Sequence, residues 1–189
     1  MQTICVFAGA ASGARESYRL AARELGTEIG RRGMGMVYGG AAAGMMGICA
    51  DAALAAGAKV TGVLPRSLMT REIAHQRLTD LRVVGSLHER KAMMSALCDA
   101  VVALPGGCGT LDELFEAITW AQLGLHDKPI GMLDADGYYA TLFAFLDHAR
   151  AQGFVQATPF LTSAPSAAAL LDALSALPRQ RIASAPPRA

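Results

Sequence analysis

The chain has few charged and few aromatic residues, at 17% and 6% of its 189 residues. It has no long run of Lys or Arg and a net charge of +1, so neither nucleic acid nor an anionic membrane is an expected partner. No CxxC pair occurs among its four cysteines, which favours reduced thiols. It also has no apolar stretch suited to crossing a bilayer and no basic n-region of a signal peptide. We therefore expect a cytoplasmic protein.

Two common nucleotide-binding motifs are missing as well. No Gly-Lys-Ser/Thr follows a glycine loop, so the Walker A motif is absent. The full GxGxxG fingerprint is absent too, and Tyr38-Gly39 stands where a ribose-binding Asp or Glu would be expected. These absences disfavour NAD binding and ATP hydrolysis, whereas a mononucleotide or a sugar phosphate remains a possible ligand. No His, Asp or Glu cluster has metal-ligand spacing, so neither a metal nor a cofactor is expected.

Hydrophobic residues make up 52% of the chain, and short apolar runs alternate with helical patterns from end to end. Continuous apolar runs are typical of parallel strands that are covered on both faces. The alternation predicts a single-domain, Rossmann-like α/β fold, a doubly wound parallel sheet with helices on both faces. Strands are expected at 3–8, 35–38, 59–64, 81–84, 100–104 and 129–133, and helices at 15–31, 45–56, 87–97, 111–123 and 138–152.

The end of the chain predicts one more helix, from Ala164 to Leu177, with Ser163 or Ser166 as its cap. Beyond Pro178 the residues are mainly Pro, Arg, Ser and Ala, which indicates a flexible tail. We therefore expect one nucleotide-binding domain over residues 1–178 and a tail over 179–189.

Three glycine loops follow predicted strands, at 8–13, 39–44 and 105–110. In open α/β sheets ligands bind outside the carboxyl ends of the strands, so these loops should meet at that edge. The third loop belongs to the run Pro105-Gly-Gly-Cys-Gly-Thr-Leu-Asp-Glu113, which opens a helix. Unpaired N–H groups at a helix start form an anion site. A carboxylate beside a phosphate is repelled, so Glu113 needs a role of its own.

A purely structural alternative exists for Thr110 and Glu113. The pattern Thr-x-x-Glu at a helix start is a capping box, in which both side chains accept from backbone N–H groups. A cap does not require the preceding Gly-Gly-x-Gly, so Thr110 is expected to cap the helix and also contact phosphate. Taken alone, Arg90 and Lys91 would likewise be interpreted as solvated helix residues.

With this motif in view, the sequence closely resembles the LOG ("Lonely guy") family of cytokinin riboside 5'-monophosphate phosphoribohydrolases, which are often mislabelled as lysine decarboxylases. The resemblance runs from Ile4 to about Phe160 and includes several spaced blocks in the family's order. These blocks are Cys5-Val-Phe7, Val37-Tyr-Gly-Gly40, Gly44-Met-Met-Gly47, Gly62-Val-Leu-Pro65, Glu72-Ile-Ala-His75 and His88-Glu-Arg-Lys91.

The resemblance implies hydrolysis of the N-glycosidic bond of a nucleoside 5'-monophosphate, such as AMP or N6-isopentenyl-AMP, to free base and ribose 5-phosphate. It implies Arg90 and Glu113 as the catalytic pair and a homo-oligomer, a dimer or larger, with the site close to the subunit contact. The nucleotide-contacting positions that it implies are Glu72, Arg90, Lys91, Gly106, Gly107, Cys108, Gly109, Thr110, Leu111, Asp112, Glu113 and Thr119.

The chemistry agrees with this assignment, because cleavage of the bond builds positive charge on the sugar. A carboxylate near the anomeric carbon stabilises that charge or orients the attacking water. The permanent charge of Arg90 pairs with phosphate or keeps Glu113 ionised. Cys108 is interpreted as a spacer, and Glu116 as a solvated or salt-bridged helix residue. Met45 and Met46 are interpreted as core residues, with an adenine pocket as the alternative.

Two departures from the family pattern concern ligand preference. Ala10-Ala11 replaces the usual Ser-Ser, and Ala41-Ala42 stands where Gly and Ser are usual. A second hypothesis is therefore a non-catalytic carrier of a nucleotide or a pterin cofactor on the same fold. A lysine decarboxylase is a third hypothesis, although no lysine has the context of a pyridoxal phosphate site. The sequence leaves open AMP against the isoprenylated nucleotide, and dimer against hexamer.

Overall fold

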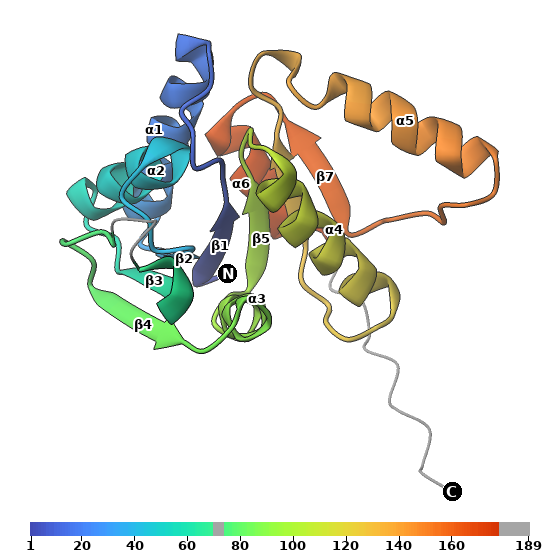
Figure 1. Cartoon of the computed structure of the whole chain (residues 1–189). Helices are drawn as coiled ribbons and strands as arrows, with labels where there is room; N and C mark the ends of the chain where they lie inside the picture. The colour runs from blue at the N-terminus through green and yellow to red at the C-terminus, as the bar shows by residue number, and fades with distance from the viewer. Residues whose placement is uncertain (70–73, 178–189) are drawn as a thin grey trace, which may run out of the picture.

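The computed structural model describes residues 1–69 and 74–177, and a fully parallel sheet forms its centre (Figure 1). Within these residues the sheet has seven strands in the order β4-β3-β2-β1-β5-β6-β7. Each neighbouring pair is parallel, as the predicted doubly wound fold requires. The strands are β1 (Thr3–Phe7), β2 (Gly35–Tyr38), β3 (Val60–Pro65), β4 (Asp80–Val84), β5 (Ala100–Ala103), β6 (Ile130–Leu133) and β7 (Leu161–Ala164).

Helices cover both faces of the sheet. Along β1, Ile4 and Val6 belong to the core cluster under α1, α2 and α6, whereas Cys5 and Phe7 belong to the cluster under α3 and α4. This alternation follows from the two-residue period of a strand. The helices are α1 (Glu16–Arg31), α2 (Gly44–Ala55), α3 (Leu87–Ala96), α4 (Cys108–Gln122), α5 (Ala140–Ala151) and α6 (Ala167–Ala176), with short 3-10 turns η1 (Arg66–Leu68) and η2 (Ala135–Gly137).

The six expected strands and six expected helices are present, with ends shifted by up to three residues. One strand was not predicted: β7 is a short edge strand whose residues, Leu-Thr-Ser-Ala, are too polar to form an apolar run. Ala164 ends this strand, so the prediction that it begins the last helix is wrong. That helix begins at Ala167, where the hydroxyl of Ser166 caps it by accepting from the Ala169 N–H. The predicted tail, 179–189, lies outside the described residues.

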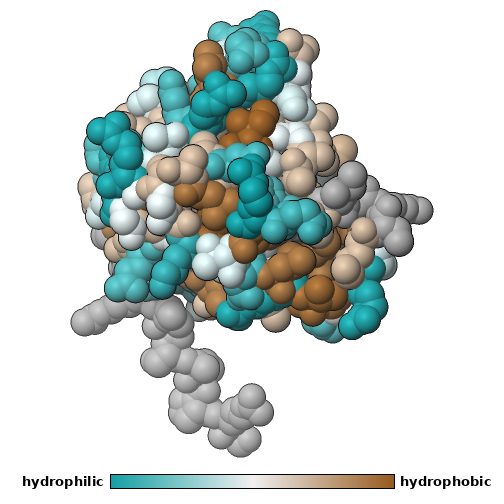
Figure 2. Space-filling model, turned by 90° about the vertical axis from the view of Figure 1, so that its left-hand side faces the viewer, coloured by the Kyte–Doolittle hydropathy of each residue, from teal (hydrophilic) through white to brown (hydrophobic). Residues whose placement is uncertain are grey.

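The edge strand β4 is more exposed than its apolar residues suggest. Leu81 and Val83 are partly open to solvent, because the sheet ends there and α3 covers only part of the strand. The side of the molecule that carries α2 and β4 shows apolar residues at the surface among hydrophilic ones (Figure 2). None of the described helices is long and apolar enough to span a membrane.

The strand order places a topological switch point between β1 and β5. The chain leaves β1 toward β2 on one side, and the second half of the sheet starts with β5 on the other side. Crevices of this kind, outside the carboxyl ends of the strands, are where open α/β sheets bind ligands. The loops after β1 and β5 are two of the predicted glycine loops, so the fold brings them together at the expected edge.

Candidate active site

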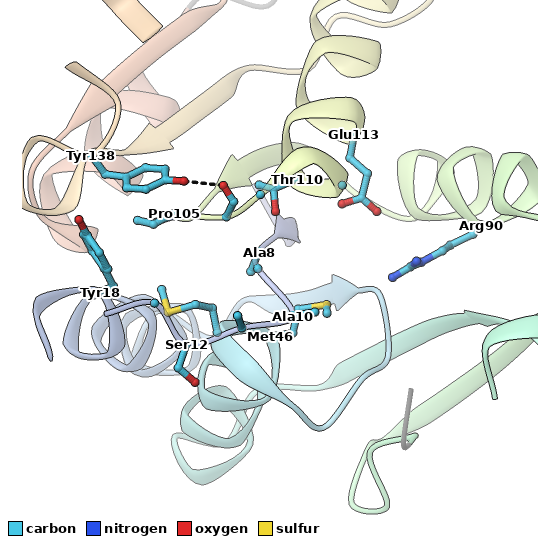
Figure 3. Close-up of a pocket in the computed structure, with 17 residues that line it drawn as sticks. Ala8, Ala10, Ser12, Tyr18, Met46, Arg90, Pro105, Thr110, Glu113 and Tyr138 are labelled. Atoms are coloured by element: carbon cyan, nitrogen blue, oxygen red, sulfur yellow. Dashed lines mark hydrogen bonds between the residues drawn. The ribbon is translucent and has the colours of Figure 1, made fainter. Parts of the chain in front are cut away.

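A cavity of about 500 Å³ lies at this switch point, within the usual size range of small-molecule sites (Figure 3). Its walls are the glycine loop 8–13 and, from the loop after β5, residues 105–107, 109 and 110, together with side chains from α1, α2, α3, α4 and the turn before α5. Tyr18 and Tyr138 lie at one end of the cavity, Thr110 lies near its middle, and Arg90 and Glu113 lie at the other end (Figure 3). The cavity therefore has an aromatic end and a charged end.

The loop after β5 leads directly into α4, which begins three residues earlier than expected. Gly107 is the N-cap, and Cys108, Gly109 and Thr110 form the first turn. The N-cap Gly107 has no side chain, and Thr110 lies in the first turn instead of at the N-cap, so the capping-box interpretation of Thr110 and Glu113 is wrong. The first turn forms although glycine at 107 and 109 has low helix propensity, so the surrounding chain imposes the early helix start. The start of α4 lies at the cavity wall, and the first N–H groups of a helix favour an anion.

Gly106 allows Thr110 and the Gly9 backbone to approach it unusually closely within this wall. A Cβ atom at residue 106 would overlap the Thr110 hydroxyl and would lie 2.9 Å from the Gly9 nitrogen. No other residue fits here without displacing one of these neighbours. The two glycine loops consequently pack directly against each other.

Three successive carbonyl groups of this loop each accept a hydrogen bond from a different position in the fold. The Tyr139 hydroxyl donates to the Leu104 carbonyl at 2.6 Å, and the Gly9 N–H donates to the Pro105 carbonyl at 3.4 Å. The Tyr138 hydroxyl donates to the Gly106 carbonyl at 2.6 Å (Figure 3). The peptide planes ahead of α4 are thereby oriented by residues from outside the loop.

Arg90 is a buried cation at the charged end of the cavity. It belongs to α3 and is only 7% exposed. Its Nη2 atom donates to the Gly39 carbonyl oxygen at 3.2 Å, while its buried Nε–H has no hydrogen-bond partner among the described residues. An unpartnered buried donor costs about 1–3 kcal/mol, so it requires an explanation. A ligand with acceptor oxygens in the cavity would supply the partner.

Glu113 projects from the second turn of α4 into the same end of the cavity as Arg90 (Figure 3). Side chains of a helix tilt toward its N-terminus, so the Glu113 carboxylate reaches back toward the turn that contains Thr110. Thr110 itself is buried and lines the cavity. Glu113 and the anion-binding end of α4 therefore face one ligand volume.

The predicted contact residues divide into two groups. Arg90, Gly106, Gly107, Gly109, Thr110 and Glu113 line the cavity. A shallow depression on the outer side of α4 instead contains Cys108, Leu111, Asp112 and Thr119. Glu72 lies outside the described residues.

Lys91 lies with the second group. Its ammonium group pairs with Asp112 at 3.2 Å and with Glu116 at 3.1 Å. Partial burial opposes its charged form, but these two carboxylates raise the pKa of Lys91 above its ordinary value. The prediction that Glu116 is salt-bridged is confirmed.

The departures from the family pattern fall unevenly around the cavity. Ala10 and Ala11 line it, whereas Ala41 and Ala42 do not, so only the first pair can alter direct ligand contacts. Met45 and Met46 are both buried, as the core interpretation expects, and they also line the cavity; an adenine pocket there stays a prediction.

Sequence reasoning missed the aromatic end of the cavity. Tyr18 and Tyr138 come from two segments that carry no recognisable motif, and only their meeting in space makes them a wall. The tandem tyrosines after β6 were the available signal, because residues just beyond a strand's carboxyl end lie near the ligand edge of such a sheet.

The fold and this cavity define the chain as a Rossmann-like α/β protein with a pocket at the switch point. A family described as "Possible lysine decarboxylase" matches residues 46–174. The cytokinin riboside 5'-monophosphate phosphoribohydrolase LOG1 of Arabidopsis thaliana is 48% identical over 173 residues, or 90% of this chain and 81% of that protein. The enzyme LOG of Oryza sativa subsp. japonica, with the same activity name, is 48% identical over 89% of this chain and 70% of its own length. The chain belongs to this family, the LOG family.

A solved structure with the same fold is the molybdenum cofactor carrier protein of Chlamydomonas reinhardtii. It covers 93% of this chain and 97% of its own, with a TM-score of 0.69 and 23% sequence identity. At that level of identity the likeness concerns the fold alone, and function has to be argued from the site.

Proposed function

We propose that the protein hydrolyses the N-glycosidic bond of a nucleoside 5'-monophosphate, releasing the free base and ribose 5-phosphate. The observation that carries this proposal is the placement of Glu113 and Arg90 in one cavity with the N-terminus of α4. The names of the LOG relatives from Arabidopsis thaliana and Oryza sativa, at 48% identity, support the same reaction.

The phosphate is proposed to bind at the start of α4. There the N–H groups of the first turn and the helix dipole favour an anion, and the Thr110 side chain lines the same wall. With the phosphate held at this point, the sugar extends along the cavity toward Glu113, about one helical turn further on. The anomeric carbon then lies near the carboxylate, and the base lies beyond it.

In the reaction, a water oxygen bonds to the anomeric carbon as the bond from that carbon to the base nitrogen breaks. The electron pair of the broken bond leaves with the base, which takes up a proton, while the water loses one. Positive charge builds on the sugar in the transition state, and the negative charge of Glu113 stabilises it. The repulsion between Glu113 and the phosphate is thus offset, in the transition state, by the attraction between Glu113 and the positively charged sugar.

Arg90 is proposed to act from the opposite wall of the charged end. Its Nε–H donor is buried and unpartnered, so an acceptor oxygen of the nucleotide would satisfy it. Its fixed charge also favours the ionised form of a nearby carboxylate. Both effects require the guanidinium to stay where Gly39 holds it.

Two other functions have less support. A carrier without catalysis is the weaker candidate, because the LOG relatives at 48% identity are named as phosphoribohydrolases and the carrier structure shares only 23% identity. A lysine decarboxylase needs a lysine that bonds to pyridoxal phosphate, and no lysine is among the described residues that line the cavity. Absence of the absorbance band of an aldimine would exclude the decarboxylase.

We further propose that the protein acts as a homo-oligomer. The second group of predicted contacts, on the outer side of α4, lies apart from the cavity in one chain. Its members would reach a nucleotide only if a neighbouring chain brought its own cavity against that surface. Leu123 and Leu125, just beyond α4, are exposed apolar residues that such a contact would cover. Light scattering on the purified chain tests this proposal, and a monomer would contradict it.

The catalytic proposal is tested by incubating the protein with AMP and, separately, with isopentenyladenosine monophosphate. Free base and ribose 5-phosphate are the expected products, and the ratio of the two rates identifies the preferred base. The control is Glu113→Gln, which should still bind nucleotide but release no base at a comparable rate. Failure of the wild type to release base from either nucleotide would contradict the proposal and leave the carrier as the better hypothesis.

A further inference from the structure

The proposed mechanism gives no role to Tyr138, although this side chain makes one of the shortest hydrogen bonds at the cavity. Its hydroxyl donates to the Gly106 carbonyl at 2.6 Å, and its ring is part of the cavity wall. The residue is 38% exposed, so core packing alone does not account for its position. A specific contact on the glycine loop points to a role in that loop.

The geometry of the peptide bond shows what this contact controls. The Gly106 carbonyl and the Gly107 N–H belong to one planar, trans peptide unit, so they point in opposite directions. A hydrogen bond that fixes the carbonyl toward Tyr138 therefore also fixes the N–H of Gly107 away from it. Gly107 is the N-cap of α4, and this residue lines the cavity wall where the phosphate is proposed to bind. Neither glycine has a side chain that could hold this peptide unit by itself.

The Tyr138 ring is itself held from several sides. It makes edge-to-face contacts with Tyr18, at a centroid distance of 5.5 Å, and with Tyr139, at 4.9 Å. The preceding turn places Asp136 and Gly137 in the left-handed region, with φ of 56° and 68°. Asp136 also pairs with Arg15 at 2.6 Å, which links the turn to the start of α1. The hydroxyl thus approaches Gly106 from an ordered support.

We propose that Tyr138 is a positioning residue, which acts through the Gly106 carbonyl to aim the Gly107 N–H at the phosphate of the bound nucleotide. This inference rests on the proposed function only in taking a nucleoside monophosphate as the ligand. The phenol need not touch the reacting atoms. Its effect falls on binding of the phosphate group and leaves the bond-breaking step at Glu113 unchanged.

The neighbouring tyrosine provides a matched control. Tyr138 and Tyr139 each donate to a backbone carbonyl at 2.6 Å. Tyr139, however, is buried and bonds to Leu104, which lies two residues further than Gly106 from the N-cap of α4. Tyr138→Phe keeps the ring contacts and removes only the hydroxyl. Tyr139→Phe removes the same group from the core, where a carbonyl left without its donor reduces stability.

The experiment titrates the full chain with AMP and with adenosine by calorimetry, and melts each variant thermally. For Tyr138→Phe we expect a Kd for AMP raised about three- to ten-fold, an unchanged Kd for adenosine and a near-wild-type Tm. For Tyr139→Phe we expect a near-wild-type Kd for AMP and a Tm lower by about 3–6 °C. In an assay of base release, the KM of Tyr138→Phe should rise while kcat stays close to that of the wild type.

Other outcomes overturn the inference. If Tyr138→Phe binds AMP as the wild type does, or if AMP and adenosine weaken equally, Tyr138 does not aim the phosphate site. If the wild-type chain fails to bind AMP, both this inference and the proposed function fail. If the wild type binds AMP without releasing base and the variant still binds it more weakly, only the proposed hydrolysis fails.

Discussion

Arg90 lies directly against the backbone of Gly39, and its Nη2 atom donates to the carbonyl oxygen of that glycine at 3.2 Å. A Cβ atom at residue 39 would overlap this guanidinium nitrogen, so the position of the arginine depends on the missing side chain. Gly39 directly follows Tyr38, the last residue of β2, and does not line the cavity. Its conformation is one that other residues adopt, so the requirement for glycine comes from Arg90.

We therefore predict that Gly39→Ala lowers kcat/KM for nucleotide hydrolysis about 10²-fold or more, since displacement of a catalytic group by about 1 Å has that effect. The measurement is steady-state kinetics in a double-mutant cycle with Arg90→Ala. If Gly39 acts through Arg90, the alanine at 39 should cause little further loss once the arginine is gone. Additive losses would instead show an independent role for the glycine.

Glu113→Gln should reduce kcat about 10²- to 10⁴-fold, because the neutral amide cannot stabilise positive charge on the sugar. Affinity for AMP should be retained or increased, since the repulsion between the carboxylate and the phosphate is removed. Glu116→Gln is the control one turn along the same helix, where the carboxylate pairs with Lys91. Rates of base release and calorimetric binding of AMP, measured on both variants, test this prediction. Equal losses of kcat in the two variants would argue against a special role for Glu113.

Ala10→Ser is expected to strengthen AMP binding about three- to ten-fold, because a hydroxyl in the cavity wall adds one hydrogen-bond donor near the phosphate. Ala42→Ser is the matched control, since residue 42 does not line the cavity. Calorimetry with AMP measures both variants. An Ala10→Ser variant with unchanged affinity would show that the first loop does not contact the ligand.

His126 should make the stability of the protein depend on pH. Burial, aided by the nearby charge of Lys128, lowers the pKa of this histidine below its ordinary value. Between the lowered and the ordinary pKa the unfolded chain binds more protons than the native one, so stability falls as the pH decreases through this interval. Above the ordinary pKa the effect is absent.

The test compares urea unfolding of the wild type and of His126→Asn from about pH 8 to about pH 5. The asparagine keeps an acceptor for the Lys128 N–H, which His126 Nδ1 accepts in the wild type at 3.2 Å. The wild type should lose more stability than this variant over the range. His148→Asn, at an exposed position of α5, should follow the wild type. Parallel curves for the wild type and His126→Asn would disprove the prediction.

The fold could be predicted because each central strand is buried on both faces and therefore reads as a continuous apolar run. Val101 and Val102, for example, face opposite core clusters and are both buried. The strand β7 could not be predicted, because at the edge of the sheet only Ala164 is buried and the other residues had no need to be apolar. The sequence therefore indicates a strand where an apolar run is present, as in the edge strand β4, and misses the edge strand β7, which has none.

The candidate site was predictable only in part. The glycine loop and Glu113 are contiguous in sequence, and they share a cavity wall in the structure. Arg90 and Gly39, in contrast, are 51 residues apart and meet only because β2 and α3 converge at one side of the pocket. The start of α4 was misjudged, because glycines at 107 and 109 do not favour a helix unless the chain around them imposes one.

The support of Pro105 and Gly106 by Gly9 and Tyr138 bears on how far the glycine motif can be moved between proteins. The nine residues from Pro105 to Glu113 do not by themselves contain the groups that orient their peptide planes. A graft of this segment onto another α/β scaffold should therefore have the sequence of the motif but lack its affinity for phosphate. The hydrogen-bond donors that follow β1 and β6 would have to be grafted with it. The smallest functional graft therefore consists of three separate stretches of the chain.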